Sequence, residues 1–333
     1  MSTDHRRKIT VLVTGVGAII GQGIIRSLRK SHHRVRVLGI DRSQCSPGSR
    51  LCDAFIQKPA CEENHPDYLA FWLTTTREQH VDLVLPGLEV DVAFLSQHRA
   101  SFESQGTVLA LNRHELIELS SDKWLLGEVL RRHDLPLIPS MLPSNWDDAI
   151  RELGMPPLLF KPRTGNGSRG IVRLDSEEDF NYWSHRAGKN AMLQRIVGND
   201  DEEFTVGVFG LADGTAVKPI VFRRRLSAAG NTQKAEVVDD STIEEASMEL
   251  SALFRPIGPT NYQFRKEAGI AYLLEINPRF SSSNSLRTAF GYNEADMAIE
   301  YFLLNQRPRV PRILSGTAWR YNEDFVIHDC DSV

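Results

Sequence analysis

Strand and helix patterns alternate through the first third of this sequence and then give way to a succession of strands. Apolar, β-branched runs alternate with segments of helical spacing, in the order strand 9–14, helix 19–30, strand 35–40, helix 66–80 and strand 81–86. Such alternation predicts a parallel sheet covered by helices, in a unit that ends near residue 112.

The pattern changes beyond residue 112. Residues 112–132 have helical spacing, with Ser121 as a candidate helix cap, and short helix and strand patterns follow at 146–153, 158–161, 170–174 and 176–186. After residue 190, strand patterns dominate, at 192–197, 203–209, 215–225, 261–266 and 270–276, with helical patterns only at 242–254 and 294–305. Strands in series predict antiparallel pairing, so we expect an α/β unit followed by an α+β region.

Composition excludes several classes of protein. The 333 residues include 39 basic and 43 acidic side chains, and a net charge of −4 predicts no basic face for nucleic acid. No apolar run approaches the roughly 18–20 residues of a membrane span, and the opening MSTDHRRKITVLVTG lacks the apolar core of a signal peptide. Cysteines at 45, 52, 61 and 330 lack metal-site spacing. We therefore expect a cytoplasmic protein with no nucleic-acid or membrane partner.

The first glycine-rich turn, at 14–21, follows a strand and opens a helix. Asp41 ends the next strand, which is close to the pattern of a dinucleotide-binding site. Tyr262 and Lys266 add the YxxxK spacing of short-chain dehydrogenases. That chemistry needs both residues on one helix, whereas the pattern around them predicts a strand. A tight structural turn at 14–21 is the favoured interpretation, with a nucleotide site as the alternative.

The second glycine-rich loop follows the apolar strand that ends at Lys161. Three glycines, Ser168 and two arginines occupy residues 163–170, and Pro162 is expected to end the strand pairing. Backbone amides and the hydroxyl of such a loop can hold an anion, with Lys161 as a point charge. A flexible hairpin is the alternative.

Polar side chains alternate with apolar ones near residue 275. Glu275 and Asn277 share one face of the predicted strand, since side chains alternate along it. If an odd-length turn around Gly269 joins this strand to the preceding one, Gln263 lies opposite Glu275. Oxygen ligands that include a carboxylate suit Mg²⁺ bound to nucleotide phosphates. Arg279 follows directly and could meet a transferring phosphoryl group.

Three consecutive arginines follow Pro219. Alternation puts Arg223 and Arg225 on one face of the predicted strand. These two side chains could hold a substrate carboxylate if that face lines a cleft, and a solvated edge is the alternative.

Together these motifs resemble the ATP-grasp superfamily, in particular the branch similar to the large subunit of carbamoyl-phosphate synthase. The resemblance covers nearly the whole chain and rests on segments 121–123, 160–163, 167–170, 194–198, 202–204, 261–264 and 274–284. It implies a Rossmann-like domain at 1–112, a small lobe with the phosphate loop at 113–192, and a C-terminal lobe with the metal site at 193–333.

The resemblance also implies roles for individual residues. The implied ATP-binding residues are Lys123, Lys161, Gly167, Ser168, Arg169, Gln194, Arg195, Val197 and Glu203. Gln263, Glu275 and Asn277 would hold Mg²⁺, as one ion or two, with Mn²⁺ as a substitute, and Lys161 and Arg279 would act in catalysis. Asn284 and Arg287 lie near the family's acceptor region. The family usually has Glu at the position of Arg195, so only its backbone contact to adenine carries over.

The activity implied by the resemblance is that of an ATP-dependent ligase. It would activate a small-molecule carboxylate as an acyl phosphate and join it to an amine, releasing ADP and phosphate, and the family suggests a homodimer. Bicarbonate as the activated acid, as in carbamoyl-phosphate synthesis, is one alternative. An NAD(P)-dependent oxidoreductase based on the first glycine turn is another, and a nucleotide-binding regulator without turnover is a third.

Overall fold

The computed structural model describes residues 8–165, 170–187, 190–228, 230–321 and 323–326. Its contacts divide the chain into two compact units. Unit 1 contains Met1–Leu111, Thr232–Glu236 and Arg279–Val333, and unit 2 contains Asn112–Asn231 and Val237–Pro278. The sequence predicted one lobe from residue 193 to the end. In the division by contacts, the described residues between 279 and 326 group with the N-terminal part of the chain, because long-range contacts decide the grouping.

Unit 1 is built on a five-stranded sheet in the order β3-β2-β1-β4-β5. Its strands are parallel. Their bounds are β1 Ile9–Thr14, β2 Val35–Asp41, β3 Ala54–Gln57, β4 Leu83–Leu85 and β5 Val108–Leu109. The helical connections are α1 Ile19–Leu28, the 3₁₀ turn η1 Pro47–Leu51, α2 Pro66–Glu78, α3 Glu89–Gln97 and α4 Arg99–Glu103. The central strands are buried along almost their whole length, as in parallel sheets covered on both faces. The alternating sequence pattern is confirmed.

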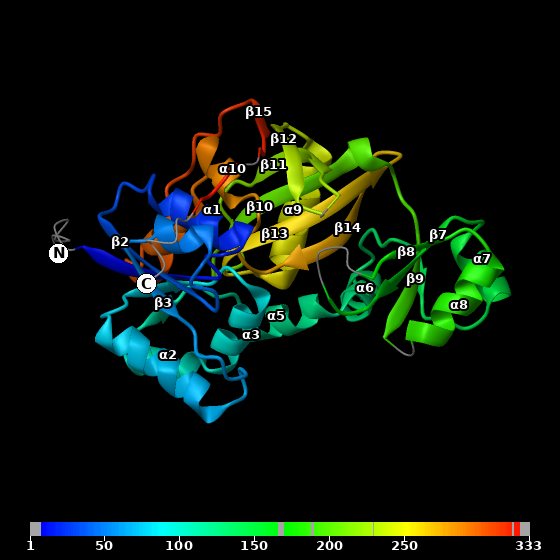
Figure 1. Ribbon diagram of the computed structural model, residues 1–333. Helices are drawn as coiled ribbons and strands as arrows, with labels where there is room; N and C mark the ends of the chain where they lie inside the picture. Colours follow the sequence, from blue (N-terminus) through cyan, green and yellow to red (C-terminus); the bar gives the residue numbers. More distant parts are fainter. Residues whose placement is uncertain (1–7, 166–169, 188–189, 229, 322, 327–333) are drawn as a thin grey trace. The chain divides into compact units, whose positions relative to one another are not determined.

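The C-terminal residues complete unit 1. Helices α10 (Asn284–Ala289) and α11 (Glu294–Ala298) pack against α1, and β15 (Thr317–Trp319) pairs antiparallel with β12 (Thr232–Val237). In Figure 1 the orange α10 lies beside the blue α1. The sequence predicted a single helix at 294–305. The structure has α11 followed directly by a π-helix, η3 (Ile299–Leu303).

Unit 2 contains two antiparallel layers. The smaller sheet has the order β6-β9-β7-β8, and in the larger one β14, β13, β10 and β11 are successive neighbours. The smaller sheet comprises β6 Ser140–Met141, β7 Leu158–Pro162, β8 Val172–Leu174 and β9 Ala191–Arg195, with helices α7 Trp146–Leu153 and α8 Glu177–Ala187. The larger strands are β10 Glu203–Gly210, β11 Ile220–Leu226, β13 Gly258–Glu267 and β14 Ile270–Asn277, after the 3₁₀ turn η2 Asp200–Glu202. The predicted α+β region is confirmed.

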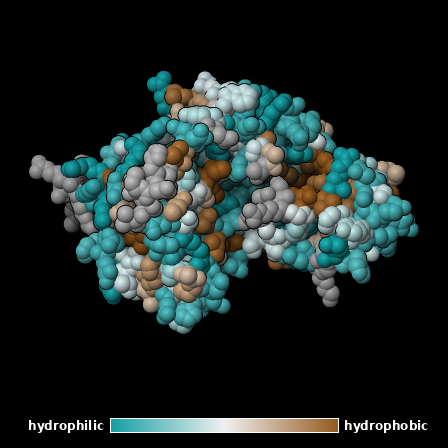
Figure 2. All heavy atoms as spheres, viewed as in Figure 1, coloured by the Kyte–Doolittle hydropathy of each residue, from teal (hydrophilic) through white to brown (hydrophobic). Residues whose placement is uncertain are grey.

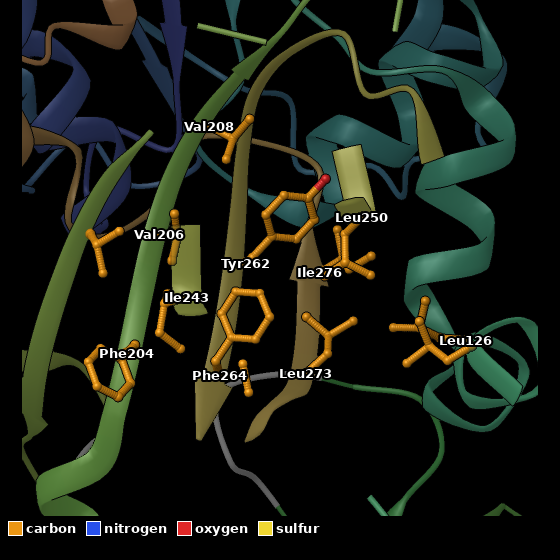
Figure 3. Close-up of a cluster of buried hydrophobic side chains, with 13 residues drawn as sticks. Leu126, Phe204, Val206, Val208, Ile243, Leu250, Tyr262, Phe264, Leu273 and Ile276 are labelled. Atoms are coloured by element: carbon orange, nitrogen blue, oxygen red, sulfur yellow. The ribbon is translucent and has the colours of Figure 1, made fainter. Parts of the chain in front are cut away.

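Helices α5 (His114–Ser121), α6 (Lys123–Arg132) and α9 (Ser241–Phe254) accompany the larger sheet. Figure 3 shows its core, in which apolar side chains of β10, β13 and β14 meet Leu126 of α6 and Leu250 of α9. Tyr262 and Phe264 alternate with Gln263 along β13, so one face of the strand enters the core and the other carries polar groups.

In the β13–β14 hairpin Gln263 pairs with Glu275 as predicted, but a β-bulge produces this pairing instead of an odd-length turn. Ala268 and Gly269 form a two-residue turn with positive φ angles, and Glu267 pairs with Ile270. Continued without change, this register would place Leu274 opposite Gln263. A β-bulge between Gln263 and Phe264 shifts the register, so that Gln263 pairs with Glu275. The predicted odd-length turn is wrong, while the predicted facing of Gln263 and Glu275 is confirmed.

Contacts within unit 1 hold the first glycine-rich turn, at residues 14–21, in place. The Gly17 amide donates to Asp41 Oδ2 at 2.8 Å, so the acid that would bind a ribose instead holds the turn. A Cβ at Gly48 would lie 1.6 Å from the Val16 carbonyl oxygen, and one at Gly21 would lie 2.3 Å from that of Gly15. These close backbone approaches explain the glycines, so the geometry favours the structural turn.

Tyr262 and Lys266 lie on strand β13, as the sequence pattern predicted. Burial raises the pKa of the Tyr262 hydroxyl, which contacts the Ser251 hydroxyl at 3.2 Å. The Lys266 ammonium pairs with Asp240. The YxxxK spacing therefore does not form the helical pair that a dehydrogenase needs.

The molecular face in Figure 2 is mainly hydrophilic, with hydrophobic residues in smaller patches. Among the residues that the structure describes, none of the helices combines the length and apolar character needed to cross a membrane.

Candidate functional site

Lys161 is a buried cation at the centre of unit 2. It lies near the end of β7 with 6% of its surface exposed, and its Nζ donates to Gln194 Oε1 at 2.7 Å. Gln194 Nε2 in turn donates to the Ser140 hydroxyl at 2.8 Å, so the amide is oriented from both ends. Burial, reinforced by repulsion from Lys123 and opposed by attraction to Glu275, lowers the pKa of Lys161 to about 8. The site holds a positive charge that its surroundings only partly stabilise.

Asp122 and Lys123 join helix α6 to the second glycine loop. Asp122, rather than the predicted Ser121, caps α6, accepting from the amides at positions 124 and 125 at 2.9 and 3.2 Å. Its carboxylate also pairs with Arg163 at 2.5 Å. Burial opposes ionisation, but Arg163 and the helix amides outweigh it and lower the pKa of Asp122. Lys123 Nζ donates to the Gly165 carbonyl at 2.5 Å. The predicted phosphate-loop residues Gly167, Ser168 and Arg169 lie outside the described residues.

A pocket opens beside Lys161 within unit 2. Its lining combines Lys123, Lys161 and Gln194 with apolar groups from β9, β14 and α6, namely Met192, Leu273, Leu274, Trp124 and Leu126. Leu274 is the residue that the β-bulge of the hairpin adds to β14. A flat apolar group and an anion could therefore be bound side by side.

The segment 195–198, the predicted adenine hinge, is held by Glu267. Arg195 Nη2 pairs with Glu267 Oε2 at 2.8 Å, and the Gly198 amide donates to Glu267 Oε1 at 3.0 Å. The Arg195 amide is engaged by the Pro139 carbonyl at 3.0 Å, and Val197 is buried. Sequence reasoning missed Glu267, because its contact partners lie about seventy residues earlier. The only sequence signal for Glu267 was its position next to the hairpin turn at Ala268 and Gly269.

Glu203 lies in a buried cluster of guanidinium groups. Its Oε1 accepts from Arg224 Nη2 at 2.9 Å, and its Oε2 accepts from Arg265 Nη2 at 3.0 Å. Arg224 Nη2 also donates to Gln263 Oε1 at 2.6 Å. The acid expected to bind ribose is therefore already paired twice, and one expected metal ligand accepts a hydrogen bond from a cation.

Among the three consecutive arginines of β11, the middle one lies in this cluster. Arg224 is 6% exposed, whereas Arg223 and Arg225 are exposed, and Arg225 pairs with Asp201 at 2.5 Å. The sequence correctly put Arg223 and Arg225 on one face. Burial shows that this face is the solvent-exposed one, so the geometry does not favour them as substrate ligands.

Glu275 and Asn277 lie next to each other at the end of β14. Asn277 Nδ2 donates to Glu275 Oε1 at 3.0 Å, and Gln263 is the cross-strand neighbour of Glu275. The structure thus brings the three predicted metal ligands together on one face of a hairpin. A carboxylate with two amide groups is a donor set that fits Mg²⁺, provided that Gln263 exchanges its bond to Arg224 for the ion.

Arg279, Asn284 and Arg287 belong to unit 1, and each side chain makes polar contacts there. The Arg279 guanidinium pairs with Glu89 at the start of α3. Asn284 Nδ2 donates to a carbonyl of α1 at 3.2 Å. Arg287 is fully buried and pairs with Glu294 at 3.1 Å, and burial raises the pKa of Glu294 despite this pairing. In the structure both side chains hold α10 within its own unit, and their acceptor role stays a prediction.

Two family models match complementary parts of the chain. Residues 191–325 match the family described as ATP-grasp in the biosynthetic pathway with Ter operon, and residues 11–110 match the PylC-like N-terminal domain. The chain has a two-part ATP-grasp fold, in which a parallel α/β domain precedes the antiparallel sheets of unit 2.

Solved structures and curated relatives support the same fold. N5-carboxyaminoimidazole synthetase from Staphylococcus aureus, complexed with ADP, is 18% identical over 91% of this chain and 80% of its own, with a TM-score of 0.71. The biotin carboxylase–β-γ-ATP complex from Campylobacter jejuni is 16% identical over 95% and 75%, with a TM-score of 0.69. The carbamoyl phosphate synthase large chain of Mycobacterium sp. (strain JLS) is 24% identical over 194 residues. That match covers 54% of this chain but only 17% of the relative.

Proposed function

We propose that this protein is a Mg²⁺-dependent ligase that uses ATP to join a small-molecule carboxylate to an amine, forming ADP and phosphate. The observation that carries the proposal is the arrangement within unit 2. There, a buried lysine is held by Gln194 and attracted by the charge of Glu275, which neighbours Gln263 and Asn277 on one hairpin. A cation beside a set of oxygen ligands suits a metal-bound polyphosphate.

Nucleotide binding uses the pocket beside Lys161. Lys161 and Lys123 supply positive charge to the phosphates, together with the loop that contains Gly167, Ser168 and Arg169. The backbone of Arg195 and Val197 meets the adenine edge, and Glu267 keeps that segment in place through its two contacts. Glu203 serves the ribose indirectly, because its carboxylate orients Arg224 and Arg265.

The hairpin residues hold the metal. Glu275 and Asn277 are neighbours already, and Gln263 joins them when Arg224 turns toward the phosphates or toward Glu203 alone. Bound Mg²⁺, as one ion or two and with Mn²⁺ as a substitute, neutralises charge that develops on the phosphates. Arg224 next to the ligands adds a positive charge that sequence reasoning did not assign.

The chemistry follows from carboxylate activation. A carboxylate oxygen attacks the γ-phosphorus of ATP, the bond to the β-phosphate oxygen breaks, and ADP leaves. The amine nitrogen then attacks the acyl carbon, and phosphate departs as the amide forms. Lys161 and Arg279 stabilise negative charge in the first step, which requires Arg279 to exchange Glu89 for the phosphoryl group. Bicarbonate as the acid is the second candidate, favoured by the carboxylating enzymes among the structural neighbours.

The assay is ADP release over a panel of carboxylates, including bicarbonate, each with and without amines. We expect Glu275→Ala to abolish amine-dependent phosphate release while circular dichroism shows a folded protein. Glu249→Ala, on the exposed face of α9, is the matched control and should keep full activity. Unchanged turnover in Glu275→Ala would remove the metal assignment. Stabilisation of the protein by NADH or NADPH, but not by Mg·ATP, would overturn the ligase proposal.

A further inference from the structure

Two histidines form a cluster with acidic groups in unit 1, in a region that the proposed ligase chemistry does not use. His32 and His33 lie in the turn between α1 and β2, and Asp296 lies on α11. One ligand atom from each of the three residues lies within 4.8 Å of the other two. The closest contact joins His32 Nδ1 to Asp296 Oδ2 at 3.0 Å. Side chains distant in sequence therefore converge on one point.

Glu300 approaches the other ring nitrogen of His32 from the π-helix. Its Oε1 lies 3.5 Å from His32 Nε2, and its side chain is almost fully buried. The Arg309 amide donates to its Oε2 at 3.1 Å, which orients the carboxylate. A π-helical turn is rare and recurs at functional sites. Here it follows α11 directly and places Glu300 on the side of the histidines.

Hydrogen bonds that do not involve the histidines join helices α1 and α11 beside this cluster. Asn293 accepts from the first amides of α11, at positions 295 and 296, and its Nδ2 donates to the Ser27 carbonyl of α1 at 3.1 Å. Helices α1 and α11 are thus joined beside the histidines by contacts that do not involve them. Such a frame keeps α11, which carries Asp296, beside α1 without a ligand.

Two atoms of the cluster are buried without a hydrogen-bond partner. They are His33 Nε2 and Asp296 Oδ1. A buried polar atom without a partner costs roughly 1–3 kcal/mol in other proteins, so it requires an explanation. Burial, assisted by His32, lowers the pKa of His33 below its usual value even though Asp296 and Glu300 oppose the shift.

We propose that His32, His33 and Asp296 bind a divalent transition metal ion of the Zn²⁺ type, with water as the fourth ligand. Two imidazole nitrogens with a carboxylate oxygen select such an ion over Mg²⁺ and Ca²⁺, which prefer oxygen ligands alone. Metal–ligand bonds of about 2.0–2.2 Å require the ligand atoms to close to within about 3.5 Å of one another.

The ion would connect the α1–β2 turn to α11, and thus hold this helix on the N-terminal sheet domain. The competing interpretation is a His32 side chain that contacts the carboxylates of Asp296 and Glu300, with no metal. The two accounts differ in stoichiometry, in metal selectivity and in the role of His33, which the competing account leaves without a function.

The test uses the full chain without a histidine tag, stripped of metal by a chelator. Zn²⁺ is titrated by calorimetry, and melting temperatures are recorded with Zn²⁺, Mg²⁺ or Ca²⁺. We expect one equivalent of Zn²⁺ to bind and to raise the melting temperature, with no comparable effect of Mg²⁺ or Ca²⁺ in the absence of ATP. Co²⁺ in its place should give the visible absorption of a four-coordinate site. A wild-type protein that binds no Zn²⁺ would overturn the proposal.

Variants locate the binding. His33→Gln and Asp296→Asn should each weaken Zn²⁺ binding at least on the order of 10- to 100-fold, because each removes a ligand. His185→Gln, an exposed histidine on α8, is the matched control and should bind like the wild type. Equal Zn²⁺ affinity in His33→Gln, Asp296→Asn and the control would place the ion elsewhere and overturn the assignment. The loss of binding does not depend on ligase activity, so failure of this proposal and failure of the proposed function are separate results.

Discussion

The charge of Lys161 should make ATP binding depend on pH in a way that the structure specifies. Burial lowers its pKa from 10.5 to about 8. At pH 7 about nine-tenths of Lys161 is then protonated, and at pH 9 about one-tenth. If only the ammonium form binds the phosphates, the affinity for Mg·ATP falls about tenfold between these pH values, which corresponds to about 1.4 kcal/mol.

The assay is calorimetric titration with Mg·ATP at pH 7, 8 and 9, at constant ionic strength and in buffers of different ionisation enthalpy. The phosphates should raise the pKa of Lys161, so binding near pH 8 should take up a fraction of a proton. Lys161→Arg is the control, because a guanidinium stays charged across this range and its variant should show no tenfold step. Gln194→Glu should move the step to higher pH, since a carboxylate at 2.7 Å favours the ammonium form.

The lowered pKa of Lys161 should also make the stability of the folded protein depend on pH. The pKa of Lys161 is lower in the folded protein than in the unfolded chain, so the folded state binds the proton less tightly. Without ATP, the free energy of unfolding should rise as the pH increases from about 8 toward 10.5, relative to Lys161→Met. An ATP affinity that is constant from pH 7 to 9, or an identical step in Lys161→Arg, would refute the reasoning.

Three further predictions concern single side chains. Lys58→Met leaves Asp91 buried without its ion partner and should cost about 3–5 kcal/mol in chemical denaturation, whereas Lys58→Met combined with Asp91→Leu should recover most of the loss; equal stability of the single variant and the wild type would contradict this. Asp122→Ala removes the cap of α6 and should cost about 1–2 kcal/mol, while Ser121→Ala should be nearly neutral; the reverse order would restore Ser121 as the cap. Glu267→Gln should raise KM for ATP and leave kcat unchanged, because it loosens the 195–198 segment away from the reacting atoms; a lower kcat at unchanged KM would argue against this positioning role.

Much of the fold is predictable from local pattern. The runs at 9–14 and 146–153 correspond residue for residue to β1 and α7, because apolar periodicity and a preceding cap define them locally. Strand β12 and helix α10 were not predicted, since their patterns are short and long-range packing stabilises them. The π-helix was also missed, because its sequence continues the helical spacing of α11.

The pairing register of the β13–β14 hairpin in the candidate site also could not be predicted from local pattern alone. Period-two alternation in the sequence determines that Glu275 and Asn277 share a face. The sequence does not determine that Gln263 faces them, because a two-residue turn alone would place Leu274 opposite Gln263. The bulge that corrects the pairing is a property of the assembled sheet, where Phe264 and Leu273 must both enter the core.

The sequence by itself determined the order of the main elements and the alternation that puts Glu275 and Asn277 on one face of β14. Only the tertiary structure decided that Arg224, not Arg223 or Arg225, meets Gln263, that Glu267 holds the 195–198 segment, and that the described residues between 279 and 326 group with the first unit. The physical reason is that periodicity shows which side chains share a face. Which face is buried, and against which distant partners, depends on contacts between segments far apart in the chain.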